Sequence, residues 1–245
     1  MIEKVLMVGA SHTGKVRTNN QDSFLVNEHM ALGILADGIG GRKGGKTASQ
    51  MTVDFLEQAF KKINSESALD FSSFLLTQVD AINKSLIDLG NKSETLQGMG
   101  TTLELIVLRK NRIYIGHIGD SRTYLFAGNH LWLLTIDHNI RTFLARKIIK
   151  KENLQNSYNP SALVKALGLG SECSPDIFEK IVYEDEIYLS ATDGLFDMIS
   201  DEKIFSIIQR NQNRFDLLPD LLIEEALKNG GKDNITVVLC KVLKN

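Results

Sequence analysis

The sequence is poor in cysteine, proline and tryptophan, and it has no excess of either charge. Of its 245 residues, two are cysteine, three are proline and one is tryptophan. Two cysteines are too few for a disulfide framework or a cysteine-rich zinc site, and three prolines exclude a proline-rich tail. Lysine and arginine number 28 against 30 aspartates and glutamates, a net charge of −2. The chain therefore lacks the basic excess typical of a nucleic-acid-binding domain, and no nucleic-acid partner is expected.

Long hydrophobic runs are absent as well. The longest ones, such as 31–36 and 105–108, are far shorter than the roughly 20 residues that a membrane span needs. The apolar stretch at the N-terminus is too short for a signal peptide, so the cytoplasm is the expected location. We find no internal repeat, low-complexity segment or convincing linker. Length and composition thus favour one globular domain over residues 1–245.

The hydrophobic pattern predicts a mixture of strands and helices. Short apolar or alternating runs predict strands at 5–10, 24–27, 31–36, 178–182, 187–191 and 235–242. Apolar residues at helical spacing predict one helix through Val53, Leu56, Phe60 and Ile63, and a second through Phe74, Leu75, Val79, Ile82, Leu86 and Leu89. Further helices are expected at about 201–210 and 217–229. The stretch 139–171 is expected to form a helix, a polar break and a short helix starting at Asn159-Pro160.

The middle of the chain is dense in strands, predicted at 102–108, 112–117, 122–126 and 131–134. The links Lys110-Asn111 and Gly128-Asn129 are typical of two-residue hairpin turns. Such short links require antiparallel pairing, because a parallel return needs a crossover of about a dozen residues. Antiparallel strands between sequential helix pairs favour an α+β layered sandwich over a doubly wound sheet.

Aspartates recur where apolar runs begin or end. Asp22 opens one run, and Asp37, Asp120, Asp193 and Asp233 lie at the ends of others. Any one of them is more typical of a turn than of a ligand. Strand ends of a sandwich meet at one rim, however, so several such residues can surround one point. The pattern therefore indicates a carboxylate cluster.

A carboxylate cluster implies a cation, because neighbouring carboxylates repel one another unless divalent ions neutralise them. Oxygen-only ligands suit Mg²⁺ or Mn²⁺. Zinc is the weaker choice because the five histidines are scattered. Arg17, five residues before Asp22, could hold phosphate oxygens in a bidentate grip. A surface ion pair is the simpler interpretation of this arginine taken alone.

A series of short motifs runs from about residue 9 to 242. They are Gly-x-x-Arg-x-x-Asn-Gln-Asp at 14–22, Ala-Asp-Gly-Ile-Gly-Gly at 36–41, Ala-Ser at 48–49, Met-Gly-Thr-Thr at 99–102, Gly-Asp-Ser-Arg at 119–122, Leu-Thr-x-Asp-His at 134–138, Ala-Leu-Gly at 166–168, Thr-Asp-Gly-Leu-x-Asp at 192–197 and Gly-Gly-x-Asp-Asn-x-Thr-Val-Val at 230–238. In order and spacing they resemble the metal-dependent protein phosphatases (PPM, type 2C serine/threonine phosphatases) in their compact bacterial form. That resemblance implies a four-layer α/β/β/α sandwich of two mainly antiparallel sheets flanked by helix pairs.

The resemblance also implies a role for each matched residue. Asp37 would bridge two Mn²⁺ or Mg²⁺ ions. Asp193 and Asp233 would complete the shell of the first ion, and the carbonyl of Gly38, with Asp22 nearby, would serve the second. Asp120 would form a third, weaker metal site together with Asp193, and Asp197 could join that site. Arg17 would bind the substrate phosphate, and 139–175 would form a flap beside the active site.

The activity implied is hydrolysis of phosphoserine and phosphothreonine in proteins by a metal-bridging hydroxide, reversing a bacterial Ser/Thr kinase. A monomer is expected. Ile39 stands where animal members carry a histidine that acts as a general acid, so the expected proton donor is a metal-bound water. His12 replaces an aspartate common in bacterial members.

Two other interpretations compete with this one. Residues 40–47 match the phosphate-binding P-loop pattern GxxxxGK[ST], with Lys46 as its lysine. We reject a nucleotide site because the chain lacks alternating βαβ units, and we expect Lys46 to be solvated and dispensable. The second alternative is a phosphatase-like module that binds phosphoproteins without catalysis. Such modules usually lack metal ligands, whereas Asp37, Asp193 and Asp233 are present here.

Overall fold

The computed structural model describes residues 4–40, 44–63, 70–151, 158–171 and 173–243. Ten strands form two sheets of five. The first has the order β1 (Val5–His12), β12 (Ile235–Val242), β11 (Ile187–Ala191), β8 (Arg122–Ala127) and β9 (His130–Leu133). The second has the order β10 (Asp176–Ile181), β7 (Arg112–Ile118), β6 (Leu103–Arg109), β3 (Leu32–Ala36) and β2 (Ser23–Asn27). All of these pairings are antiparallel.

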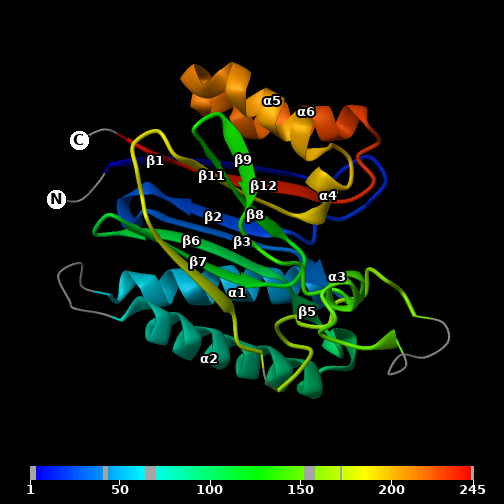
Figure 1. The fold of residues 1–245 in the computed structure, drawn as a ribbon. Helices are drawn as coiled ribbons and strands as arrows, with labels where there is room; N and C mark the ends of the chain where they lie inside the picture. Colours follow the sequence, from blue (N-terminus) through cyan, green and yellow to red (C-terminus); the bar gives the residue numbers. More distant parts are fainter. Residues whose placement is uncertain (1–3, 41–43, 64–69, 152–157, 172, 244–245) are drawn as a thin grey trace.

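Helices cover both outer faces of the stacked sheets. Figure 1 shows α1 (Gly44–Lys61) and α2 (Phe71–Lys92) under one sheet, and α5 (Asp201–Asn211) and α6 (Leu218–Lys228) over the other. Short elements complete the structure: β4 (Gly38–Ile39), β5 (Gly100–Thr101), α3 (Ile140–Ala145), α4 (Asp193–Phe196), and the 3-10 turns η1 (Glu28–Met30), η2 (Glu94–Leu96) and η4 (Gln212–Leu217). The predicted α+β, four-layer α/β/β/α sandwich is confirmed.

Alternation along the strands creates three apolar layers. In β6, Leu105 packs towards α1 and α2, whereas its neighbour Ile106 packs between the two sheets. In β12, Leu239 packs under α5 and α6, and its neighbour Cys240 lies between the sheets. Successive side chains of a strand point to opposite faces. Each strand therefore supplies the layers on both of its sides.

The two predicted hairpin turns have the expected backbone. Lys110 and Asn111 have φ of 47° and 59°, and Gly128 and Asn129 have φ of 54° and 64°. Positive φ at both central residues defines the type I′ turn, whose twist matches that of the flanking strands. The turns place β7 beside β6, and β9 beside β8.

The short helix predicted at Asn159-Pro160 is wrong. The Asn159 carboxamide accepts a hydrogen bond from the Ser161 amide at 3.0 Å, which makes a turn. Beyond it the amide of Val164 donates to the carbonyl of His138 at 2.8 Å. Backbone groups that a helix would use internally are thus paired with the segment before α3. The strand predicted from residue 31 begins at Leu32, because Ala31 has a left-handed φ of 45°.

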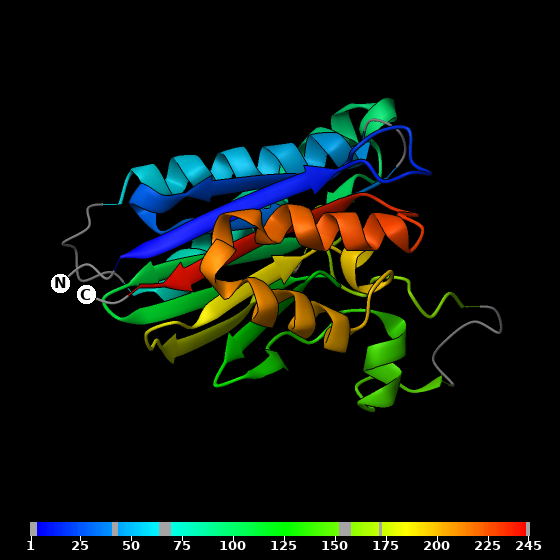
Figure 2. The same cartoon turned by 90° about the horizontal axis from the view of Figure 1, so that it is seen from above.

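The sandwich has two distinct ends. Figure 1 and Figure 2 both show the start of β1 and the end of β12 at the end opposite α3.

Within the described parts of the chain, no helix is both long enough and apolar enough to cross a membrane. The expected flap, 139–175, includes α3, and its residues 152–157 and 172 lie outside the described residues, as does Gly41 of the second motif.

Candidate metal centre

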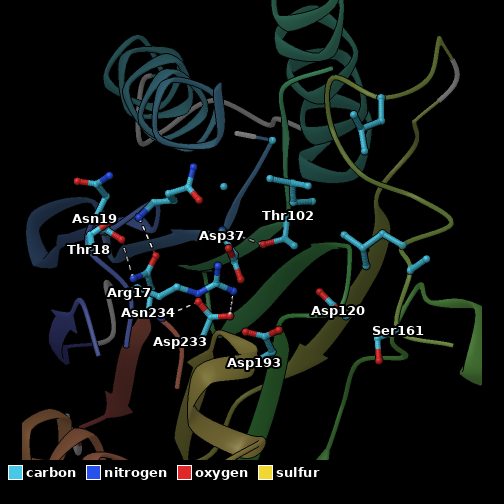
Figure 3. Close-up of a pocket in the computed structure, with 17 residues that line it drawn as sticks. Arg17, Thr18, Asn19, Asp37, Thr102, Asp120, Ser161, Asp193, Asp233 and Asn234 are labelled. Atoms are coloured by element: carbon cyan, nitrogen blue, oxygen red, sulfur yellow. Dashed lines mark hydrogen bonds and ion pairs between the residues drawn. The ribbon is translucent and has the colours of Figure 1, made fainter. Parts of the chain in front are cut away.

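Four of the predicted aspartates line one pocket of about 780 Å³. Asp37 follows β3, Asp120 follows β7, Asp193 begins α4 directly after β11, and Asp233 precedes β12. Figure 3 shows their carboxylates around a common space, although they come from both sheets. The ends of four strands meet at this rim. The structure therefore brings together side chains that are far apart in the sequence. Asp37 and Asp233, for example, are 196 positions apart.

Another part of the pocket lining comes mainly from the expected flap. Ser161, Ala162, Leu163 and Leu169 line it, together with Ile39 of β4. Two backbone hydrogen bonds between Thr101 and Leu167, of 3.0 and 2.9 Å, fix this segment to β5. On α2, the buried Asn83 side chain also accepts from the Gly168 amide and donates to the Gly170 carbonyl, both at 2.8 Å. The described part of the flap is thus tied to the core beside the acidic rim.

Asp22 lies behind the pocket and is 2% exposed. Its Oδ2 accepts hydrogen bonds from the hydroxyls of Thr236 at 2.6 Å and Thr192 at 3.1 Å. Its Oδ1 is buried without a hydrogen-bond partner. Burial raises the pKa of this carboxyl to about 6, and the charge of Asp233 adds to the effect. A buried oxygen without a partner is costly in a folded protein, which indicates that something else must satisfy it.

Asp193 is in the same situation. Its Oδ1 is also buried without a partner. Burial, followed by the charges of Asp120 and Asp233, raises its pKa to about 8. Burial and the charge of Asp22 raise the pKa of Asp37 well above its usual range. Burial, with the charge of Asp137 next, brings that of Asp120 to about 6. The rim thus holds more negative charge than it can stabilise alone.

These residues fit divalent cations. Two buried carboxylate oxygens lack partners, and the donors available are all oxygens, which suits Mn²⁺ or Mg²⁺. No three Asp, Glu, His or Cys side chains among the described residues converge closely enough to form a metal cage by themselves. The described histidines take no part in lining this pocket.

Arg17 reaches the pocket from the loop before Asp22. Its guanidinium donates to Oδ2 of Asp233 at 2.7 Å, and its side chain is 55% exposed (Figure 3). This bond and the negative charge of Asp233 raise the pKa of Arg17, so the group stays charged. The structure thus contains an ion pair at Arg17, and its partner is an aspartate of the pocket rather than a remote surface acid.

Several positioning residues were not singled out by the sequence. The Thr102 amide and the Thr101 hydroxyl donate to the Asp37 carbonyl at 2.9 and 2.8 Å, and the Asp37 amide donates to the Thr102 hydroxyl at 2.9 Å. Asn234 donates to the carbonyls of Thr13 and Asn19 and accepts from the Gln21 amide. Both groups lie inside the motifs at 99–102 and 230–238, and the motifs were the only signal that could have identified them.

The remaining predicted residues take different places. Gly38 lines the pocket, and a Cβ there would lie 2.2 Å from the Gly45 carbonyl oxygen, so only glycine fits. Asp197 does not line the pocket. It ends α4, donating its amide to the Asp193 carbonyl at 2.9 Å, and its charge contributes to the raised pKa values of Asp193 and Asp120. Their roles as metal ligands stay predictions.

Lys46 is exposed, as expected of a solvated side chain, but it also makes hydrogen bonds to the segment around Asp22. Its ammonium donates to the Asp22 carbonyl at 2.8 Å and to the Ser23 hydroxyl at 3.1 Å. The lysine of a P-loop reaches bound phosphates instead. These contacts, together with the antiparallel sheets, argue against a nucleotide site at 40–47, of which residues 41–43 lie outside the described residues.

Comparisons with known proteins agree with this architecture. The protein phosphatase 2C family matches residues 8–216. The serine/threonine phosphatase Stp of Listeria welshimeri is 31% identical over 231 residues, which cover 92% of this chain and 91% of Stp. The crystal structure of the Mycobacterium tuberculosis serine/threonine phosphatase PstP/Ppp superimposes with a TM-score of 0.86 at 32% identity, covering 98% of this chain and 99% of that one. A PstP catalytic domain in complex with two manganese ions gives a TM-score of 0.85 at 32% identity and covers the same shares. The chain therefore belongs to the protein phosphatase 2C family.

Proposed function

We propose that this protein hydrolyses phosphoserine and phosphothreonine monoesters in proteins with the help of two divalent cations, Mn²⁺ or Mg²⁺. The observation that carries the proposal is the acidic rim: four aspartates share one pocket, and two buried carboxylate oxygens behind and within it have no partner. The relatives named as serine/threonine phosphatases, and the manganese in one of them, support the reaction and the metal.

The aspartates of the rim divide into ligand groups. Asp37, which lines the pocket, would be the carboxylate shared by the two ions. Asp193 and Asp233 would complete one site, and the Gly38 carbonyl with Asp22 the other. Asp120 and Asp193, with Asp197 behind them, would form a third, weaker site. When bound, such ions would supply a water molecule of lowered pKa, which would be the nucleophile for direct attack on phosphorus.

The protein's own side chains supply orientation and charge. Arg17 is exposed, and its guanidinium would exchange Asp233 for the outer oxygens of a phosphate, which a guanidinium binds in bidentate fashion. Thr101 and Thr102 hold the backbone of Asp37 from both sides, so its carboxylate stays in place through the reaction.

The wider setting follows from the same proposal. Residues 1–245 would act as a single monomeric phosphatase domain in the cytoplasm, with 139–175 as its flap. The substrates would be phosphoproteins made by a Ser/Thr kinase, whose products this enzyme returns to the unphosphorylated state. The competing function is that of a phosphatase-like module that binds phosphoproteins without hydrolysing them. An activity assay distinguishes it from the enzyme.

The test compares two aspartate variants. The full chain is stripped of metal, and hydrolysis of p-nitrophenyl phosphate and of a phosphothreonine peptide is followed with added Mn²⁺ and then with EDTA. We expect activity that depends on Mn²⁺, is abolished by EDTA, and is lost in Asp37→Asn. Asp185→Asn is the matched control, because that side chain is 80% exposed and lies outside the pocket. A protein that binds Mn²⁺ and phosphopeptide yet hydrolyses neither ester would be a binding module.

A further inference from the structure

The first turn of α1 grips the loop that carries Asp22. Lys46 lies on this turn and donates from its ammonium to the Asp22 carbonyl at 2.8 Å and to the Ser23 hydroxyl at 3.1 Å. One turn further, the Ser49 hydroxyl lies 2.5 Å from the Gln21 carbonyl, to which it donates, and 2.9 Å from the Ser23 hydroxyl. The helix thus contacts three consecutive residues of the loop, Gln21 to Ser23.

The same turn is wedged against Gly38. A Cβ on Gly45 would lie 2.6 Å from the carbonyl carbon and oxygen of Gly38 and equally close to the Gln21 side chain. The Gly45 amide donates to the Gly40 carbonyl at 2.7 Å. The backbone of α1 therefore abuts both segments that would serve the second cation, the Gly38 strand and the Asp22 loop. Any shift of the Asp22 loop relative to α1 therefore changes the distance between this loop and the Gly38 strand.

Lys46 is the exposed member of this contact. Ser49, by contrast, is fully buried. A long lysine side chain loses considerable rotational freedom when its end is held in one place. The hydrogen bonds from Lys46 to the Asp22 carbonyl and the Ser23 hydroxyl must offset this loss of freedom, so they link α1 firmly to the segment that carries Asp22.

We propose that Lys46 is a positioning residue for the metal centre: it fixes the backbone from which the Asp22 carboxylate projects and so raises the affinity for the cation. This inference rests on the proposed function. Groups that orient ligands commonly change metal affinity 10- to 100-fold when they are removed. The ammonium charge has the opposite tendency, because a cation near the rim repels an incoming metal ion. If Lys46 positions the ligands, its replacement by an uncharged residue weakens cation binding. If only its charge matters, the same replacement strengthens cation binding.

The test measures metal binding directly. Mn²⁺ is titrated into the metal-free full chain by calorimetry, with free Mn²⁺ followed by electron paramagnetic resonance, for the wild type and three variants. We expect Lys46→Met to weaken Mn²⁺ binding about tenfold or more. Lys46→Arg, which keeps the donor, should remain within about threefold of the wild type. Lys61→Met is the matched control, because Lys61 ends the same helix and pairs only with Glu57 among the ion pairs described.

A second measurement keeps the proposal independent of turnover. Amide hydrogen exchange in the metal-free protein should be faster at residues 20–23 in Lys46→Met and unchanged in Lys61→Met. Equal or tighter Mn²⁺ binding by a folded Lys46→Met, with unchanged exchange at 20–23, would overturn the role of Lys46. Should Lys46→Met fail to fold, Lys46→Gln takes its place under the same criteria. A wild-type chain that binds no Mn²⁺ would instead overturn the proposed function, and the inference with it.

Discussion

Two groups of buried carboxylates in this protein have opposite characters. Glu104 lies between the two sheets and is 1% exposed. Both of its oxygens have partners, one on the His117 ring and one on the Thr123 hydroxyl, and Ser190 extends the network at 2.8 Å from Thr123. At the rim, in contrast, Asp22 and Asp193 each keep one buried oxygen without a partner. Both groups are therefore buried, but they differ in hydrogen bonding: both oxygens of Glu104 have partners, whereas one oxygen each of Asp22 and Asp193 has none.

The difference indicates what each group does. The network around Glu104 joins strands of both sheets, β6 and β7 on one side and β8 and β11 on the other, so it holds the layers in register. At the rim, burial and then the charges of neighbouring carboxylates raise the pKa of Asp193 to about 8 and that of Asp22 to about 6. A fully hydrogen-bonded network stabilises the fold, whereas buried oxygens without partners are costly and are typical of a binding site.

Catalysis gives the largest contrast. We expect Asp193→Asn to lower Mn²⁺-dependent hydrolysis of a phosphothreonine peptide about a thousandfold, or about 4 kcal/mol in the activation free energy, because the ligand set of the cation loses a charge. Glu104→Gln, equally buried, should retain most of the activity. Steady-state rates at saturating Mn²⁺ for the two variants measure this. Similar losses in both would remove the distinction between the two carboxylate groups.

The free energy of unfolding should show the opposite order: the change at Glu104 should be harmful and the change at Asp193 should not. Glu104→Ala leaves His117 and Thr123 without their partner and should lower the free energy of unfolding by about 3 kcal/mol. In metal-free protein, Asp193→Asn removes repulsion and should raise it by about 1 kcal/mol, a shift of about 2–4 °C in Tm for a chain of this size. Urea unfolding and thermal scans in EDTA measure both. A destabilised Asp193→Asn would mean that the rim is satisfied without a metal.

The pH dependence of stability sharpens the same point. A carboxyl whose pKa is raised on folding binds protons more tightly in the folded state, so folding weakens as pH rises towards that pKa. For Asp22, Asp120 and Asp193, with pKa values of about 6, 6 and 8, the free energy of unfolding of metal-free protein should fall between about pH 5 and pH 8. Saturating Mn²⁺ should abolish this slope, because bound metal displaces the protons from the folded state and the unfolded carboxyls are already ionised in this pH range. Urea titrations at several pH values, with EDTA or Mn²⁺, test it; a flat metal-free profile would contradict it.

How far the sequence leads depends on whether the signal is local. The strands at 187–191 and 235–242 coincide with the residues predicted, because each is a mainly apolar run with clear ends. The two-residue strands β4 and β5 have no periodicity and were not predicted. The failed helix at Asn159-Pro160 had a good local cap, but pairing with the segment before α3 took its backbone groups.

The candidate site follows the same division. The sequence predicted acidic residues at one rim because strand ends of a sandwich meet, and Asp37, Asp120, Asp193 and Asp233 do line one pocket. The interior pair was not predictable, since Glu104 meets His117 only through the register of β6 and β7. Nor did the pattern reveal that Lys46 bonds to the Asp22 carbonyl, a contact that depends on how α1 packs against a distant loop.

The smallest expected effects come from single hydroxyls, and they test the comparison most finely. Ser190→Ala removes the outermost hydroxyl of the interior network, but Thr123 still donates to Glu104, so the free energy of unfolding should fall by only about 1 kcal/mol. Its counterpart is Thr236→Val, which removes the 2.6 Å hydrogen bond to Asp22. Because that bond orients a carboxylate of the rim, we expect Mn²⁺ affinity to fall about tenfold. Calorimetric Mn²⁺ titration of the two variants decides, and weaker binding by Ser190→Ala would show that interior network and rim are coupled, contrary to the separation that their hydrogen bonds indicate.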